Sequence, residues 1–126
     1  MHFEIGILRS GNWTLYRLLQ DGHDRVGEYL DRLEIRREEE YAAIHAALDR
    51  FANSDVPPNG VKLRLEREGV YALKAGHQQR LYGFYYMKRS FVFVECCEKK
   101  RDKADQGLLQ RVCQVHREFR RQEGFR

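Results

Sequence analysis

The first twenty residues alternate between hydrophobic and polar side chains, as expected of strands with one buried face. Residues 3–8 (FEIGIL) and 13–19 (WTLYRLL) predict two strands joined by a turn at Ser10-Gly11-Asn12. The second segment could instead begin a helix capped by Asn12, and we favour the strand.

From residue 21 the hydrophobic spacing changes to that of a helix. Residues 21–33 and 35–52 each place apolar side chains three or four positions apart, which predicts two consecutive amphipathic helices. The two apolar stripes are Val26, Tyr29, Leu30 and Leu33, then Tyr41, Ile44, Leu48 and Phe51. The sequence Pro57-Pro58-Asn59-Gly60 ends the second helix.

After residue 60 the alternation returns. Residues 70–75, 79–87 and 91–97 predict three strands connected by tight turns, hence an antiparallel meander, and residues 61–66 predict a short strand or loop edge. On the last strand, strict alternation puts Val92, Val94 and Cys96 on one face. Residues 103–121 predict a final helix, followed by a frayed tail over 122–126.

This order of elements predicts the fold class. We expect one α+β domain over residues 1–126, a small fold with a mainly antiparallel sheet, in which the two N-terminal helices and the C-terminal helix pack on one face. The other face of the sheet would then be free to bind a partner.

Charge is distributed unevenly along the chain. The 126 residues have a net charge of +4, but residues 1–60 carry −4 and residues 61–126 carry +8. This asymmetry favours a polyanionic partner for the second half. The sequence has no run of 18 apolar residues, and its N-terminal segment lacks the basic start of a signal peptide, so we expect a cytoplasmic protein without a membrane partner.

The cysteines and histidines predict neither a metal site nor a cofactor. Cys96 and Cys97 are adjacent, Cys113 stands alone, and no CxxC spacing occurs, so we expect three reduced thiols. The five histidines lack metal-ligand spacing, and nucleotide-binding and serine-hydrolase motifs are missing from the sequence.

Two basic residues flank the turn between the first two strands of the meander. Lys74 and Arg80 lie three positions on either side of His77, so a hairpin would make them cross-strand neighbours. Two adjacent cations repel each other unless an anion lies between them. The alternative is that both are ordinary solvated charges at the rim.

Further basic residues border the same predicted surface. Lys99, Lys100, Arg101 and Lys103 follow the last strand, near the N-terminus of the last helix, where backbone amides favour anions. Arg64 comes from the strand before the meander, and Tyr82 is one of several tyrosines that could stack on bases. Aromatic residues on strands are, however, more often part of a core.

Three segments resemble the RelE/HigB-like toxins of the RelE/ParE superfamily, in the phage-derived HigB-like branch of type II toxin–antitoxin systems. The segments are Gly69–Lys74 (GVYALK), Gln79–Tyr85 (QRLYGFY) and Phe91–Lys100 (FVFVECCEKK). They resemble the family in a strand ending Y-x-L-[RK], a strand opening YR-x-x-Y, an apolar strand, and a basic pair before a helix. The match covers about residues 60–115.

The resemblance implies a toxin that inhibits translation as a ribosome-dependent, metal-independent mRNA endoribonuclease. Its implied partners are the ribosome, mRNA and a cognate antitoxin of the helix-turn-helix type. In the implied reaction a ribose 2′-hydroxyl attacks the adjacent phosphate, which requires a base, an acid and cations that stabilise the phosphorane. Carried over by motif, the catalytic positions are Lys74, Arg80 and Lys100.

The sequence also departs from the family pattern. Ala72 replaces a second basic residue that some members carry, and the tyrosine that some members use near the last helix has no counterpart, so His77 is a substitute candidate for acid–base work. Two other functions stay open: a ParE-type toxin that inhibits gyrase, and a non-catalytic RNA-binding or interaction module of the same fold.

Overall fold

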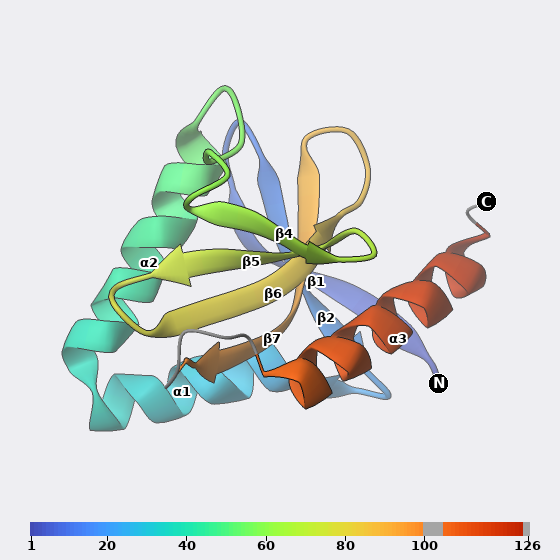
Figure 1. Cartoon of the computed structure of the whole chain (residues 1–126), viewed down its shortest axis with the longest axis horizontal. Coiled ribbons are helices and arrows are strands. Elements are labelled where there is room, and N and C mark those ends of the chain that lie inside the picture. The colour runs from blue at the N-terminus through green and yellow to red at the C-terminus, as the bar shows by residue number, and fades with distance from the viewer. Residues whose placement is uncertain (100–104, 125–126) are drawn as a thin grey trace.

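The computed structural model describes residues 1–99 and 105–124 as an α+β fold built on one sheet (Figure 1). The strands are β1 (Phe3–Ser10), β2 (Thr14–Gln20), β3 (His23–Asp24), β4 (Leu63–Arg67), β5 (Val70–Ala75), β6 (Gln79–Tyr85) and β7 (Ser90–Glu98). The helices are α1 (Arg25–Arg36), α2 (Glu38–Asn53) and α3 (Gln106–Glu123).

The sheet order is β1-β2-β7-β6-β5-β4, with β3 paired to β2. The predicted meander is confirmed, because β5 pairs antiparallel with β6 and β6 with β7. One feature was not predicted: β2 and β7 are parallel neighbours, so the N-terminal hairpin joins the same sheet as the meander. Their pairing covers only residues 14–17 of β2 and 90–93 of β7, beyond which the two strands separate.

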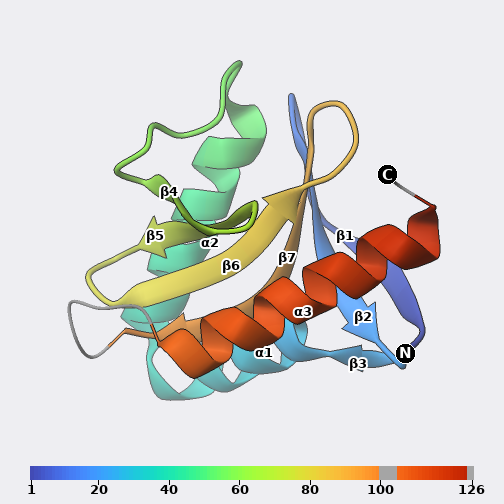
Figure 2. The same ribbon diagram turned by 45° about the vertical axis from the view of Figure 1, so that its right-hand side comes forward.

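The helices do not all pack on one face, and this part of the fold prediction is wrong. Helices α1 and α2 bury their apolar stripes with Leu73, Leu81 and Phe93 on one face of the sheet. Helix α3 covers the opposite face (Figure 2), where Phe84, Val92 and other residues form a second hydrophobic core. The central strands are apolar on both faces, so helices must pack on each face to bury its side chains away from water.

A β-bulge changes the facing of residues at the end of β7. Tyr82 lies opposite Glu95 and Gly83 opposite Phe93, so Val94 is the extra residue of β7. Cys96 therefore joins Phe93 in the core under α1 and α2, whereas Val94 belongs to the core under α3. The strict alternation predicted for this strand is wrong beyond the bulge.

Helix α3 begins and ends with recognisable caps. The Asp105 side chain accepts a hydrogen bond of 3.1 Å from the backbone N–H of Leu108. At the other end, Gly124 adopts the left-handed conformation with φ of 78°. The helix extends to Glu123, so the predicted frayed tail is too long.

Candidate nucleic-acid interface

Lys74 and Arg80 are direct cross-strand neighbours, as their spacing predicts. Lys74 of β5 is the register partner of Arg80 of β6, and Arg80 is in turn the partner of Cys97 on β7. Both basic side chains are half-buried. Because Ala72 and Tyr82 point into the core under α3, Lys74 and Arg80, each two residues away, share that face of the sheet.

Neither basic residue is neutralised by a carboxylate among residues 1–99 and 105–124. The ion pairs of this part of the chain join other arginines and histidines to acids, and the Arg80 guanidinium donates only to the backbone carbonyl of Gln79, at 2.9 Å. The pair therefore keeps donor capacity for an anion.

The neighbouring row of the sheet adds one more cation. Arg64 lies opposite Ala72, which lies opposite Tyr82. Arg64 is exposed, so its guanidinium is accessible on the same side as Lys74 and Arg80. The three cations come from three adjacent strands, β4, β5 and β6, with Arg64 one row away from the Lys74–Arg80 pair.

Tyr82 does not form part of an exposed binding surface. Its side chain is 1% exposed beneath α3, so the prediction that it stacks on RNA bases is wrong, since stacking requires an open ring face. Its hydroxyl is hydrogen-bonded to Cys97, and burial raises the pKa of both groups. Tyr82 supports the strand on which Arg80 lies.

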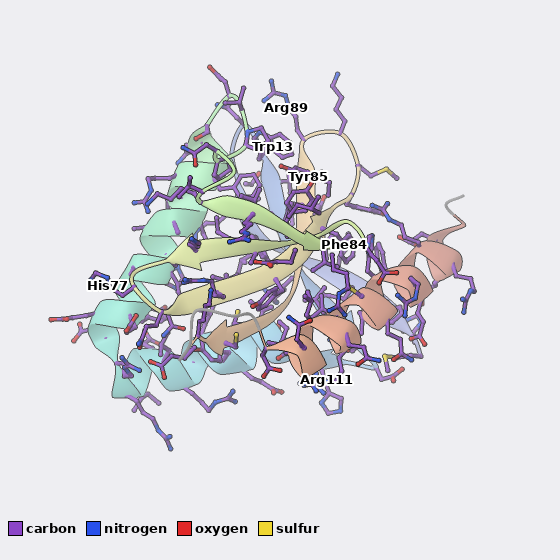
Figure 3. All side chains as sticks on the ribbon, in the orientation of Figure 1. Trp13, His77, Phe84, Tyr85, Arg89 and Arg111 are labelled. Carbon is purple, nitrogen blue, oxygen red and sulfur yellow. The ribbon has the colours of Figure 1, made fainter. Side chains whose placement is uncertain are left out.

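His77 lies at the tip of the β5–β6 turn, beside α2 (Figure 3). It is exposed and lines a depression with Gly76 and with Arg37, Glu38, Glu39, Glu40 and Ala43 of the α1–α2 region. These neighbours are mostly acidic and belong to the helices on the opposite face from Lys74 and Arg80. The structure does not bring His77 into the same cluster as the cationic pair.

The basic segment after β7 is described only at its start. Lys99 is half-buried, and its backbone N–H donates a 2.6 Å hydrogen bond to the carbonyl of Gln78, which fixes this residue beside the start of β6. Lys100, Arg101 and Lys103 lie outside the described residues.

Two contacts that the sequence did not predict support Lys74 and Arg80 from the opposite face of the sheet. Tyr29 of α1 is hydrogen-bonded to the fully buried side chain of Gln79, and Arg37 forms an ion pair with Glu98 at the end of β7. Both contacts join the α1–α2 region to the strand ends beside Arg80 and Lys99. No local pattern in the sequence indicates such long-range polar pairs.

In the described part of the chain, His116 does not supply a neutral-pH acid or base to Lys74 and Arg80. His116 of α3 stacks on Phe84 at 4.2 Å, and burial together with Arg120 lowers its pKa to about 4. Among residues 1–99 and 105–124 there is no group of three side chains placed to hold a metal ion. In the same part of the chain, no helix is long and apolar enough to cross a bilayer.

Lys74 and Arg80, with Arg64 beside them, can bind a phosphate. Two adjacent cations on a rigid sheet can contact the oxygens of a phosphodiester and stabilise added negative charge on it. A comparison with protein-family models finds none that matches this chain, and a search of curated proteins finds no similar sequence.

Proposed function

We propose that the protein is an RNA-directed toxin: a ribosome-dependent endoribonuclease that cuts mRNA and is held inactive by a cognate antitoxin. The observation that carries the proposal is the cross-strand pair of Lys74 and Arg80, half-buried on one face and without a carboxylate partner in the described residues. Its support is the sequence resemblance to RelE/HigB-like toxins, in which these two positions match motif residues.

In the proposed reaction the two cations act on the scissile phosphate. Arg80, held by the carbonyl of Gln79, donates to a non-bridging oxygen, and Lys74 lies next to it. As the ribose 2′-oxygen attacks, the phosphorane gains negative charge, and both cations stabilise it more strongly than the ground state. Water takes the proton of the 2′-hydroxyl as the bond to phosphorus forms and gives a proton to the 5′-oxygen as its bond to phosphorus breaks, which yields a 2′,3′-cyclic phosphate and a free 5′-hydroxyl.

The experiment is induced expression followed by primer extension on a defined mRNA. We expect new 5′ ends to arise with the wild type and to be lost with Lys74→Ala/Arg80→Ala. The matched control is Arg50→Ala/Lys88→Ala, which removes the same charge from exposed positions outside the cluster. An unchanged cleavage pattern with the Lys74/Arg80 variant would refute the proposal.

One observation favours a second candidate, a non-catalytic RNA-binding module of the same fold. In residues 1–99 and 105–124, His77 of the adjacent turn lies toward α2. His116 lies next to Gly69 of the β4–β5 turn and has a pKa of about 4. Neither histidine therefore provides acid–base chemistry at Lys74 and Arg80. RNA binding that depends on Lys74 and Arg80, without new 5′ ends on translating ribosomes, would identify this function.

A further inference from the structure

The outer edge of β4 presents backbone groups that point away from the rest of the sheet. β4 is the last strand of the sheet order and has only β5 beside it (Figure 1). The carbonyl of Lys62 accepts a 2.8 Å hydrogen bond from the N–H of Lys74, whereas the N–H of Leu63 bonds to Asn59 instead of β5. Because inward and outward residues alternate along an antiparallel pair, the N–H and C=O of Leu65 also point outward. Neither group has a partner in residues 1–99 or 105–124.

The opposite edge of the sheet, formed by β1, is covered by side chains. The amide of Gln122 bonds to both the N–H and the C=O of Phe3, each at 2.9 Å, as a neighbouring strand would. Arg17 donates a 3.2 Å hydrogen bond to the carbonyl of Ile7 on the same edge. Side chains that occupy these groups prevent another strand from pairing there. The edge at Leu65 has no such cover in the described residues.

The side chains around Leu65 complement a second copy of themselves. Leu65 is apolar and 56% exposed. Arg64 and Glu66 stand on either side of it with opposite charges, and neither forms an ion pair with residues 1–99 or 105–124. Both lie on the α3 face, since Arg64 is opposite Ala72 and the Glu66 carboxylate is close enough to Tyr82 to raise the pKa of its hydroxyl.

Only one register brings these charges together. If two copies of β4 pair antiparallel about a two-fold axis at Leu65, Arg64 of each copy lies opposite Glu66 of the other copy. The two Leu65 residues then exchange N–H to C=O hydrogen bonds across the axis. A shift of two residues in one direction places Arg64 opposite Arg64, and a shift in the other direction places Glu66 opposite Glu66. Charge therefore selects the pairing centred on Leu65.

We propose that β4 is a self-association edge, through which two copies of this chain join their sheets in an antiparallel pairing centred on Leu65. The inference goes beyond the proposed function and does not depend on it, because the pairing needs no RNA. The strand has five residues and a bulge beyond Leu65, so the contact is short and the dimer is weak. The pairing also places Arg64 against a carboxylate, which leaves a dimerised chain one cation fewer for a phosphate.

The test is sedimentation equilibrium of the full chain between about 1 µM and about 1 mM, where a weak dimer forms reversibly. Arg64→Glu alone and Glu66→Arg alone each place like charges opposite one another twice in the dimer, and each should weaken it at least about tenfold. An equimolar mixture of these two variants should dimerise again, because each reversed charge then meets its opposite. The double variant Arg64→Glu/Glu66→Arg should dimerise like the wild type. Lys88→Glu is the matched control, an equal charge change at an exposed position away from β4.

Three outcomes would overturn the proposal. These are a wild-type chain that stays monomeric up to the highest concentration, a dimer that both single variants leave intact, and a mixture of the single variants that stays monomeric while the wild type dimerises. Misfolding cannot imitate the expected result, because mixing two unfolded variants would not restore a dimer. RNA cleavage by a chain that never dimerises leaves the proposed function standing, and a dimer without cleavage leaves the self-association edge standing.

Discussion

Tyr29 of α1 donates a 2.5 Å hydrogen bond to the side-chain oxygen of Gln79, the first residue of β6. The backbone carbonyl of Gln79 accepts a hydrogen bond from Arg80 in turn. A helix on one face of the sheet thus holds the residue that orients a cation of the other face. Burial raises the pKa of Tyr29 to about 12, so the hydroxyl keeps its proton at any physiological pH.

Tyr29→Phe tests this connection. It leaves the fully buried Gln79 oxygen without its donor, which should lower the free energy of unfolding by about 1–3 kcal/mol. If the protein cleaves RNA, cleavage should also fall, because Arg80 loses part of its support. Urea unfolding and primer extension measure the two effects. Tyr41→Phe is the control: in the described residues its hydroxyl has no hydrogen bond, and we expect a change within about 0.5 kcal/mol.

Gly83 allows β6 and β7 to approach closely at the bulge. A Cβ atom at this position would lie 2.1 Å from the carbonyl oxygen of Val92, which belongs to a backbone fixed in the sheet centre. Gly83→Ala should therefore destabilise the protein by about 1–3 kcal/mol or more, measured by urea unfolding. Gly60→Ala is matched to it, since a Cβ there meets no atom within 4 Å. Equal stability of the two variants would contradict the close approach.

His116 should make the stability depend on pH. Its pKa is about 4 in the folded protein and near 6.5 in an unfolded chain. As the pH falls below 6.5, the unfolded state binds the proton first, so the free energy of unfolding decreases until about pH 4. Above pH 6.5 this group contributes no pH dependence.

The variant His116→Gln removes this titration and retains an acceptor for the Arg120 side chain, which bonds to His116 at 3.1 Å. Chemical unfolding at pH 7 and pH 5 should show a smaller loss of stability in the variant than in the wild type. Identical losses would show that His116 is protonated equally in both states.

Asp105 holds the first turn of α3 through its hydrogen bond to the N–H of Leu108. Asp105→Ala should cost about 1 kcal/mol of stability, whereas Asp105→Asn, which keeps a side-chain acceptor, should cost much less. Thermal or urea unfolding of the two variants measures the difference. A loss of the same size in both would mean that the charge, not the cap, is what matters here.

The elements were predictable where a single periodicity governed a segment. The strand over 70–75 and both N-terminal helices follow directly from their apolar spacing, and the facing of Lys74 and Arg80 follows from the turn between them. The placement of α3 was not predictable in this way, because its stripe fits either face of a sheet. Only the apolar residues on both faces of the central strands decide which face α3 covers.

The juxtaposition of Gln20 and Glu95 where β2 and β7 separate could not be predicted from the sequence, for two physical reasons. Gln20 and Glu95 come from strands that become neighbours through a parallel pairing, and no turn links the two strands. Glu95 also reaches its face through a bulge, which shifts the alternation by one residue. Local patterns do not encode either relationship, whereas they do encode a hairpin pair such as Lys74 and Arg80.

The position of β7 has a consequence for how the chain folds. It is the last strand in sequence, yet it lies between β2 and β6 in the sheet. The N-terminal hairpin therefore cannot join the meander until the chain is nearly complete, and the β2–β7 contact closes a very long loop. We expect this docking to be the slow step of folding, so that a nascent chain lacking β7 exposes two unfinished sheets with open edges.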